Sequence, residues 1–387
     1  MQGSSIDIDM TLRGQAGHRV LITGGAGFVG SHLADRLLQA GYQVRVLDNL
    51  TEQVHGANAK RPDYLDERVE LIQGDVRDAA KVAEALQGVD AVYHFAAAVG
   101  VGQSMYEIER YTDINNRGTA VLLEALAAQP VRRLVVASSM SLYGEGLYHN
   151  SAGMLCVPHE RDLQALRSGD WELKDHTGEN LEPIATPESK IPIPSSVYAL
   201  SKYDQERLCL IAGSAYNIPT VALRFFNIYG TRQALSNPYT GVLAIFSSRY
   251  LNDKPPQIFE DGLQRRDFVH VQDVAQACQL ALEKEEAAGQ VFNVGSGNAY
   301  TVVEIAEKIG KVLKKSHINP EITGKYRVGD IRHCYADISK AREVLGYNPS
   351  VTLEDGLAEL AGWLKSQTAT DRTDEMQSEL ARRGLAV

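Results

Sequence analysis

Residues 20–38 read VLITGGAGFVGSHLADRLL, and this stretch decides the fold. It opens with a short apolar run, Val20–Ile22, which is typical of a parallel strand covered on both faces. Gly24, Gly27 and Gly30 follow with the spacing G-x-x-G-x-x-G, and apolar residues then recur at helical intervals. A strand, a glycine turn and a helix in this order bring backbone N–H groups and the positive end of a helix dipole to one point. That point suits a pyrophosphate.

An acidic residue at the end of the next predicted strand supports a dinucleotide site. The strand is predicted over Gln43–Leu47, and Asp48 follows it, about 20 residues after the glycine turn. A carboxylate at this spacing binds the adenosine ribose hydroxyls and repels a 2′-phosphate, so the pattern favours NAD over NADP. A glycine-rich turn without a ligand is the alternative, because glycines also punctuate ordinary loops.

Strands and helices alternate beyond this unit. Further strands are predicted at 69–73, 91–95, 133–137 and 220–227, with helices between them. This alternation predicts an α/β fold with a Rossmann-type, doubly wound parallel sheet, in which ligand chemistry lies at the carboxyl ends of the strands. The alternation weakens afterwards, which indicates a smaller C-terminal α/β lobe that binds substrate.

The predicted division of the chain follows these changes. Residues 1–17 are polar and are expected to form a loose leader, and 18–227 are expected to form the NAD-binding domain. Within that domain, the proline-rich insertion 145–194 is predicted to be an extended surface loop and a candidate lid. Residues 228–367 are assigned mainly to the substrate-binding lobe, and 368–387 to a charged tail, helical or loose.

Composition excludes several classes of function. The chain has 387 residues and a net charge of −10, which argues against general binding to nucleic acid or to an anionic membrane. Its four cysteines show no C-x-x-C spacing, so neither a zinc site nor a redox motif is indicated. No apolar run approaches the roughly 20 residues of a membrane span. We therefore expect a cytoplasmic protein with reduced thiols and no metal.

A second decisive stretch is predicted to be helical, over Ser195–Tyr216. Tyr198 and Lys202 are four residues apart and would share one face of that helix. An ammonium beside a phenol favours the phenolate and lowers its pKa, which would make the tyrosine a base near neutral pH. Such a pair is common by chance, but it gains weight beside the nucleotide turn and the serines at 138–141.

Together these motifs resemble the extended short-chain dehydrogenase/reductase family, and within it the nucleotide-sugar epimerases and dehydratases. The resemblance runs from about Arg19 to Leu364, and the motifs occur in family order. They are TGGAGFVG at 23–30, GDVRD at 74–78, HFAA at 94–97, SSMSLYG at 138–144, YALSK at 198–202, RFFNIYG at 224–230, RRDFVHVQD at 265–273, NVGSG at 293–297 and GDIRHCYAD at 329–337.

The resemblance implies roles for individual residues. Tyr198 would be the acid/base, Lys202 would tune it and hold the nicotinamide ribose, and Ser139 would hydrogen-bond the reacting sugar oxygen. Together with Tyr198 and Lys202, the expected NAD contacts are Gly24, Gly27, Phe28, Val29, Gly30, Asp48, Asn49, Asp75, Val76, Phe95, Ala96, Ala97, Asn115, Ser138 and Phe225. The expected substrate contacts are Ser139, Ser141, Asn227, Arg232, Val242, Arg266, Arg327 and Asp330.

The arginines among these contacts suit a diphosphate, because each offers charge and paired donors. Surface ion pairs are the alternative for Arg232, Arg266 and Arg327. A cysteine, Cys334, stands where some relatives carry a bulky tyrosine beside the sugar, which would leave more room. Packing alone could equally select that cysteine.

The resemblance also bears on the reaction. Sugar-nucleotide 4,6-dehydratases carry Asp-Glu where this chain has Met140-Ser141, and related decarboxylases keep a Glu at the position of Ser141. Without those carboxylates, the reaction that remains is oxidation and re-reduction at C4, through a 4-keto sugar, with NAD regenerated in each cycle. The sequence thus predicts an NAD-dependent nucleotide-sugar 4-epimerase.

Substrate and assembly are expected from the resemblance alone. Residues 233–246, with the insertion, resemble a bacterial branch that includes the dTDP-L-rhamnose 4-epimerases, and UDP-glucuronate and UDP-glucose 4-epimerases are close competitors. A net sugar-nucleotide oxidoreductase or other modifier of the same family, and a silent NAD-binding regulator, are the alternatives. A homodimer is expected, with helices 117–128 and 199–213 paired across a two-fold as in relatives.

Overall fold

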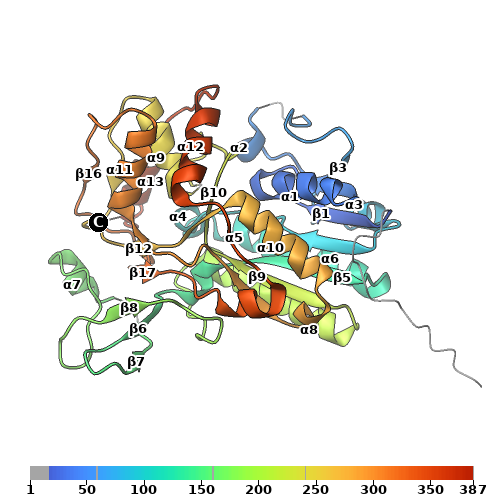
Figure 1. The fold of residues 1–387 in the computed structure, drawn as a ribbon, viewed down its shortest axis with the longest axis horizontal. Coiled ribbons are helices and arrows are strands. Elements are labelled where there is room, and N and C mark those ends of the chain that lie inside the picture. Colours follow the sequence, from blue (N-terminus) through green and yellow to red (C-terminus); the bar gives the residue numbers. More distant parts are fainter. Residues whose placement is uncertain (1–16, 58–59, 159–160, 240, 387) are drawn as a thin grey trace, which may run out of the picture.

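The structure is a computed structural model that describes residues 17–57, 60–158, 161–239 and 241–386, so residues 1–16 of the expected leader lie outside the described residues. Within that part, seven parallel strands form the central sheet (Figure 1). Their order confirms the predicted doubly wound α/β fold: β14 (Val291–Val294), β9 (Thr220–Phe225), β5 (Arg133–Ser139), β4 (Ala91–His94), β1 (Arg19–Thr23), β2 (Gln43–Asp48) and β3 (Glu70–Gln73).

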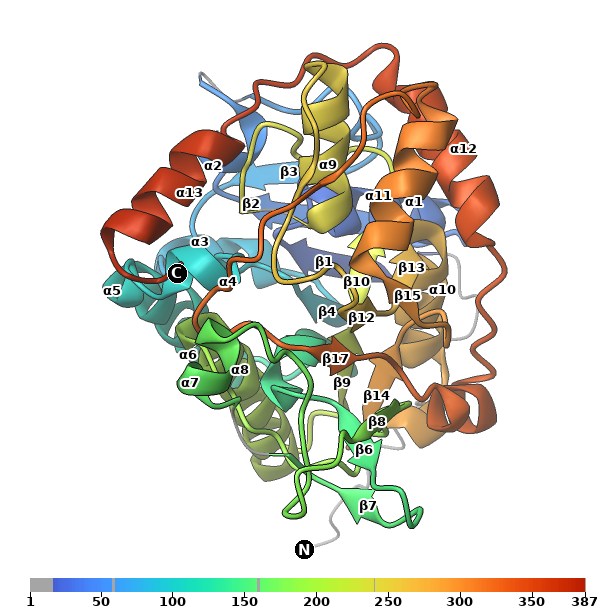
Figure 2. The same cartoon turned by 90° about the vertical axis from the view of Figure 1, so that its left-hand side faces the viewer.

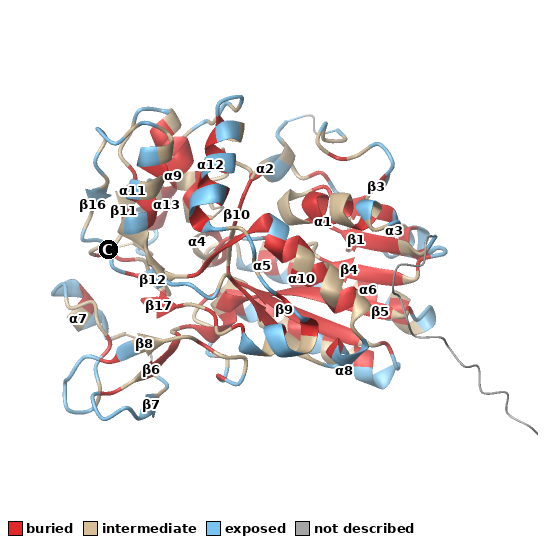
Figure 3. Ribbon diagram, in the orientation of Figure 1, coloured by how far each residue is buried: buried red, intermediate tan, exposed pale blue. Residues whose placement is uncertain are grey.

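Helices cover both faces of this sheet. On one face lie α1 (Phe28–Gln39) and α10 (Val271–Glu283), and on the other lie α3 (Ala79–Leu86), α6 (Gly118–Ala128) and α8 (Val197–Ala215). Neighbouring residues of a strand point to opposite faces, so Ile22 packs in the first core and Leu21 in the second. Because both faces are buried, the strands are continuously apolar, as Figure 3 shows for the red central sheet.

Short helical turns connect the strands at the edge where the sequence motifs lie. They are α2 (Glu52–His55), α4 (Val101–Ser104), α5 (Ile108–Tyr111), the π-helix η1 (Thr112–Arg117) and the 3-10 turn η2 (Met140–Tyr143). A further 3-10 turn, η3 (Glu285–Ala287), precedes β14 at the opposite edge of the sheet. The π-helical turn η1 continues directly into α6 (Gly118–Ala128), so the helix expected over 117–128 is present and is preceded by one more turn.

The C-terminal lobe has its own apolar core between α9 (Val242–Leu251), α11 (Val302–Val312) and α12 (Leu353–Leu364) (Figure 2). Short strands and one turn complete it: β10 (Asn227–Tyr229), β11 (Gln257–Ile258), β12 (Arg265–Arg266), β13 (Phe268–His270), β15 (Tyr300–Thr301), β16 (Glu321–Ile322), β17 (His333–Cys334) and η4 (Ala341–Leu345). The segment 228–367 is not confined to the lobe, because α10 packs on α1 and β14 pairs with β9 in the central sheet.

The insertion 145–194 is not an extended loop, and that prediction is wrong. It contains a small antiparallel sheet of β6 (Leu147–His149), β7 (Leu155–Cys156) and β8 (Glu182–Ile184), together with the short helix α7 (Leu163–Arg167). Tyr148, Leu173 and Leu181 form a separate buried cluster within it. The strands have only two or three residues each, too few to produce a recognisable alternation in the sequence.

The C-terminal segment is helical over α13 (Thr373–Arg382), where the sequence left helix and loose chain open. Met376 and Leu380 are buried, and the backbone N–H of Val328 donates to the carbonyl of Leu385 at 3.0 Å. This segment therefore packs onto the body of the protein. None of the helices among the described residues combines the length and apolar character that a membrane crossing requires.

Candidate active site

The glycine turn between β1 and α1 is shaped by close packing at two glycines and by openness at a third. Gly24 has a φ of +71°, and a Cβ there would lie 2.8 Å from the backbone nitrogen of Ala96. A Cβ on Gly30 would lie 2.5 Å from the Cα of Gly25. At Gly27 a Cβ would meet only the Gly24 carbonyl oxygen, at 3.4 Å. The turn before α1 thus leaves room for a ligand at the N-terminus of that helix, as a dinucleotide phosphate requires.

Asp48 ends β2 beside this turn, as expected. One carboxylate oxygen accepts from the N–H of Ala26 at 3.0 Å, and the other accepts from the N–H of Leu50 at 2.9 Å. The carboxylate therefore braces the glycine turn. Each carboxylate oxygen has a further lone pair, so both can also accept from a ribose hydroxyl.

The residues after β3 form a second acidic position near the same edge. The side chain of Asn49 donates to Asp75 at 3.1 Å, and Arg77 forms two hydrogen bonds to the Asp75 carboxylate. The hydrogen bond from Arg77 lowers the pKa of Asp75 to about 2, so this carboxylate is ionised at neutral pH. Val76 is buried against α6, where a Cβ on Gly118 would lie 2.6 Å from its methyl group.

The small residues after β4 lie next to the glycine turn. Phe95 packs edge-on against Phe225, with 5.9 Å between ring centroids, and Ala96 and Ala97 are half-buried. The other expected cofactor contacts on this edge, Phe28 and Val29, occupy the first turn of α1 and are half-buried.

Asn115 is one of the expected cofactor contacts, and in the structure its side-chain amide hydrogen-bonds to other residues of the protein. The side chain is fully buried, accepts from the N–H of Ala98 at 2.7 Å, and donates to the carbonyl of Ala98 and to Ser201 Oγ at 2.9 Å. Both amide hydrogens are used in these contacts. Asn115 therefore joins the loop after β4 to α8 and positions that helix.

The serines at the end of β5 have different partners. Ser139 Oγ donates to Ser141 Oγ at 3.1 Å and hydrogen-bonds to Tyr198. Ser138 Oγ donates to Glu206 of α8 at 2.6 Å. The structure thus brings Ser139, Ser141 and Tyr198 together, from β5, η2 and α8.

The electrostatics of Tyr198 and Lys202 differ from the prediction. Burial raises the pKa of Tyr198, and the hydrogen bond with Ser139 offsets part of that shift. Burial lowers the pKa of Lys202 to about 8, and its ammonium donates to Gln205 Oε1 at 2.6 Å. The expected lowering of the Tyr198 pKa by Lys202 is therefore wrong for the protein alone. A four-residue spacing gives two side chains one helix face, but it does not decide which acceptor the lysine reaches.

Three of the expected substrate residues meet at the loop before β17. The Arg266 guanidinium donates to the carbonyl of Arg332 at 2.8 Å, and Arg327 donates to Asp330 at 2.9 Å. Burial alone would raise the pKa of Asp330, but Arg327 and Arg266 hold it below its ordinary range. Arg266, Arg327 and Asp330 thus form one charged group in the structure.

Arg232 is placed elsewhere. Its guanidinium pairs with Asp35 of α1 at 2.7 Å and lies 5.5 Å from the ring centroid of Tyr64. The backbone at Arg232 has a φ of +67°, and this left-handed turn after β10 directs the chain toward α1. Its ion pair with Asp35 matches the alternative considered for it, so its expected substrate role gains no support from this position.

Asn227 and Val242 are placed at the start of the lobe. Asn227 begins β10, and its side-chain oxygen is buried without a hydrogen-bond partner among the described residues. Such an atom is normally paired, and a bound ligand would supply the missing donor. Val242 is the first residue of α9 and is half-buried against the core of the lobe.

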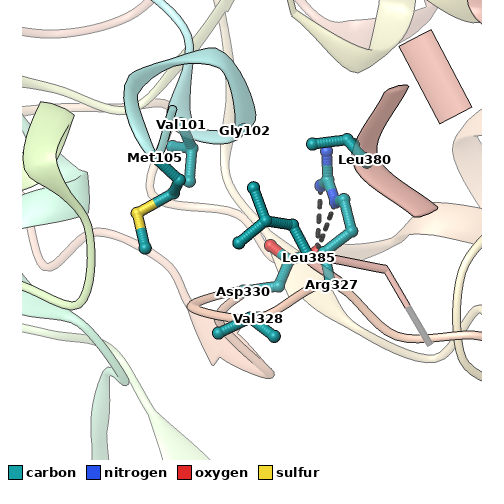
Figure 4. Close-up of a pocket in the computed structure, with 8 residues that line it drawn as sticks. All are labelled: Val101, Gly102, Met105, Arg327, Val328, Asp330, Leu380 and Leu385. Atoms are coloured by element: carbon teal, nitrogen blue, oxygen red, sulfur yellow. Dashed lines mark hydrogen bonds and ion pairs between the residues drawn. The ribbon is translucent and has the colours of Figure 1, made fainter. Parts of the chain in front are cut away.

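A pocket lies where α4, the 327–330 loop and the C-terminal segment meet (Figure 4). Arg327 and Asp330 form its polar side, and the remaining lining is apolar. The other lining residues are Val101, Gly102, Met105, Val328, Leu380 and Leu385. The sequence treated 368–387 as a tail, so this contribution of α13 and Leu385 was missed. The four-residue spacing of Met376 and Leu380 was the signal in the sequence that could have revealed a helix with a buried face.

A buried ion-pair cluster anchors the insertion to the lobe, and the sequence did not reveal it. Arg332 is fully buried and pairs with Glu172 of the insertion, with Glu260 at 3.0 Å and with Asp261 at 2.7 Å. Arg161 of the insertion pairs with Glu260 at 2.7 Å. These bonds hold the insertion in place next to Asp330, whose carbonyl accepts from Arg161. Cys334 is buried at the same junction, with its thiol 3.9 Å from Thr186 Oγ1.

Comparison with known proteins gives a family and several close relatives. The model of the NAD dependent epimerase/dehydratase family matches residues 20–163 and 174–295. A dTDP-L-rhamnose 4-epimerase of Burkholderia thailandensis is 35% identical over 355 residues, which cover 91% of this chain and 96% of that protein.

Solved structures show the same similarity. The UDP-glucuronic acid 4-epimerase of Bacillus cereus, solved with UDP-glucuronic acid and NAD, is 29% identical with a TM-score of 0.74 and covers 90% of this chain and 99% of its own. The UDP-glucose 4-epimerase of Thermus thermophilus, solved with NAD, is 30% identical with a TM-score of 0.71 and covers 90% and 100%. The central sheet, the glycine turn and the Ser139–Tyr198 pair therefore lie in a chain that is similar to these enzymes over nearly its whole length.

Proposed function

The chain belongs to the NAD dependent epimerase/dehydratase family, and on that basis we propose that it is a nucleotide-sugar 4-epimerase. The observation that carries the proposal is the site at the end of β5. There the Ser139–Tyr198 pair lies beside Met140 and Ser141, where an eliminating enzyme would need carboxylates. A single acid/base can remove and return one proton, which suits inversion at one carbon.

NAD would bind along the carboxyl edge of β1 and β2, with its pyrophosphate at the N-terminus of α1 and its adenosine ribose at Asp48. Bound there, NAD would supply the hydride acceptor and donor that oxidation and re-reduction at the sugar C4 require. The openness at Gly27 fits this assignment, since it leaves space in front of the helix. We assign the nicotinamide ribose to Lys202 and Tyr198.

The side chains of the protein would carry out the proton transfers. Reacting as its phenolate, Tyr198 would accept the proton of the C4 hydroxyl as the C4–H bond breaks, and Ser139 would donate a hydrogen bond to the same oxygen. The 4-keto sugar would then rotate within the site so that its other face is presented to the hydride. Tyr198 would return the proton to the oxygen as the new C4–H bond forms. The atoms balance within the cycle, because the proton and the hydride both return to the sugar.

The substrate would extend from this site toward the lobe. Arg266 and Asn227 are assigned to its diphosphate, and Arg327 and Asp330 to its nucleotide part. Arginine offers the charge and paired donors that a diphosphate needs. We propose dTDP-L-rhamnose as the substrate, supported by the similarity to the Burkholderia thailandensis enzyme, with UDP-glucuronate and UDP-glucose as the next choices.

We also propose a cytoplasmic homodimer. Support for the dimer comes from α8, which exposes the apolar side chains of Leu200, Leu208 and Ile211 along its outer face. All four cysteines lie in described segments and none forms a disulfide there, which accords with a reducing compartment. Sedimentation velocity on the wild type and on Ile211→Glu tests the dimer, since the charged variant should be monomeric.

The experiment that tests the function is incubation of the protein and NAD with separate dTDP- and UDP-sugars, followed by chromatography that resolves the 4-epimers. We expect interconversion of one pair of epimers with no net formation of NADH. NADH in proportion to the sugar consumed would indicate an oxidoreductase, and loss of water from the sugar would indicate a dehydratase. Either result would overturn the epimerase proposal.

A further inference from the structure

Lys202 is almost completely buried, and its surroundings are mostly neutral. Its side chain is on α8, and its ammonium donates to the side-chain oxygen of Gln205, one turn along the same helix, at 2.6 Å. The charged or titratable groups that face it are Glu206 and Cys209 on α8 and His94 on β4. Glu206 is already paired with Arg224 of β9, so it offers little compensation to the lysine.

A buried chain of hydrogen bonds runs from Gln205 to the end of β1. Gln205 Nε2 lies 2.9 Å from Thr119 Oγ1, which lies 2.8 Å from His94 Nε2. His94 Nδ1 lies 2.9 Å from Thr23 Oγ1. These residues come from α8, α6, β4 and β1, so the chain crosses the core between the catalytic helix and the strand that precedes the glycine turn.

The hydrogen bonds of Thr23 favour one assignment of donors and acceptors at the β1 end. Thr23 Oγ1 accepts from the backbone N–H groups of Phe95 and Ala96, both at 3.2 Å, so its own hydrogen is left to donate to His94 Nδ1. The hydrogen of the neutral imidazole is then on Nε2, where it donates to Thr119. The amide nitrogen of Gln205 also lies 3.2 Å from this Nε2, so in either tautomer it is the nitrogen of Gln205 that faces Thr119 and His94. Burial lowers the pKa of His94 to about 3, so the ring is neutral at physiological pH.

The assignment at Thr119 then decides the orientation of the Gln205 amide. The Thr119 hydroxyl hydrogen donates to the carbonyl of Asn115 at 2.5 Å, so its oxygen is left to accept from His94 and from Gln205. The amide nitrogen of Gln205 must therefore face Thr119. Its oxygen consequently faces Lys202, and a flipped amide would place two donors against the ammonium.

From this geometry we propose that Gln205, oriented by His94 and Thr119, is a positioning residue. It holds the Lys202 ammonium in place for the contacts with the nicotinamide ribose and Tyr198 that we assign to it. Gln205 acts through Lys202 and does not itself touch the reacting atoms. A neutral amide holds the ammonium without neutralising it, so the charge stays available to the nicotinamide ribose and to Tyr198. The inference rests on the proposed function for the reaction, but the hydrogen-bond chain belongs to the protein alone.

Two substitutions test this role in opposite directions. Gln205→Glu places a carboxylate against the ammonium and should raise the pKa of Lys202 by about one unit. Gln205→Leu removes the acceptor in a similar volume and should lower that pKa by a comparable amount. Ser214→Glu, at an exposed position of the same helix, adds the same charge far from the chain and should leave the Lys202 pKa unchanged.

The measurement is the pH titration of Lys202 in protein labelled with ¹³Cε-lysine, with the signal assigned by its loss in Lys202→Met. The alkaline limb of the turnover profile should move in the same direction as each pKa. Shifts of opposite sign in the two variants support the proposal. If both folded variants shift the pKa of Lys202 in the same direction, or leave it unchanged, the proposed role of Gln205 is overturned. If no sugar nucleotide is converted, the proposed function fails, while the titration still decides the role of Gln205.

A measurement on the wild type keeps the proposal testable if a variant does not fold. In ¹⁵N-histidine-labelled protein, His94 should be neutral over the whole range in which the protein is folded. A charged imidazole would carry a hydrogen on both ring nitrogens and place a second cation near the Lys202 ammonium, which would overturn the proposal.

Discussion

Two of the buried polar clusters among the described residues, one around Lys202 and one around Arg332, differ in how charge is compensated. Around Lys202 the partners are neutral: Gln205, His94 and Thr119 hydrogen-bond one another, and a single ammonium stays uncompensated. Around Arg332 the partners are carboxylates, from Glu172, Glu260 and Asp261. The Lys202 ammonium therefore stays available for the reaction. The charges around Arg332 are paired with one another, and these ion pairs hold the insertion against the lobe.

The pKa values follow from this difference. Burial lowers the pKa of Lys202 to about 8, whereas the pKa of Arg332 is raised by its carboxylate partners in spite of burial. A buried charge without a counter-ion lowers the stability of the folded protein and shifts the pKa of the group toward its neutral form. A buried ion pair keeps both groups charged, and removing one partner is what destabilises the protein. The comparison predicts that changes in the first cluster alter turnover and pH response, and that changes in the second alter stability.

The largest expected effect is on turnover. Tyr198→Phe removes the hydroxyl that exchanges a proton with the substrate, and should lower turnover by about 10²- to 10⁴-fold. NAD and sugar-nucleotide binding should be retained, because the phenyl ring keeps its packing against Tyr111. Steady-state epimerisation and calorimetric binding measure the two quantities. Undiminished turnover would remove Tyr198 from the role of acid/base.

The next effect is on stability. Arg332→Met leaves Glu260 buried with one partner fewer, and breaking a buried pair in this way should lower the free energy of unfolding by about 3–5 kcal/mol. Urea denaturation measures the change. Arg68→Met is the matched control, because its ion pair with Asp66 is exposed and its removal should change stability little. Equal losses in the two variants would contradict a special role for the buried cluster.

A pH-dependent effect follows from Lys202. The folded protein binds the Lys202 proton less tightly than the unfolded chain, with a pKa of about 8 against an ordinary 10.5. Wild-type stability, measured relative to Lys202→Met, should therefore rise as pH increases from about 8 to about 10.5, by roughly 3 kcal/mol in total. Urea unfolding at several pH values measures this difference. If the free energies of unfolding of the wild type and of Lys202→Met changed in parallel with pH, the pKa of Lys202 would not be lowered in the folded protein.

The smallest effect is expected at the half-exposed side of the ion-pair cluster. Glu172→Gln removes one charge but keeps a hydrogen-bonding side chain near Arg332 and His333, and should lower the free energy of unfolding by about 1 kcal/mol. Turnover should change less than in the Gln205 variants. A larger loss of turnover than of stability would place the insertion in the reaction itself and would weaken the contrast between the clusters.

Much of the active site could be predicted because its residues lie in local patterns. The glycine spacing before α1, the position of Asp48 after β2 and the apolar strands depend on neighbours within about 30 residues. The same holds for the pairing of Tyr198 and Lys202 on one helix, whose existence was predicted correctly. Its electrostatics were not, because the acceptor of the Lys202 hydrogen bond and the degree of burial depend on other elements packed against α8.

The sequence alone determined the parallel sheet, its glycine turn and the helix that holds Tyr198 and Lys202, since strand and helix periodicities follow from backbone geometry. The tertiary structure alone decided where long-range charges meet. Arg332 pairs with Glu172, 160 residues away, and Arg232 turns to α1 and away from Arg266 and Arg327. An ion pair needs only closeness in space and complementary charge, and neither leaves a periodic pattern in the chain.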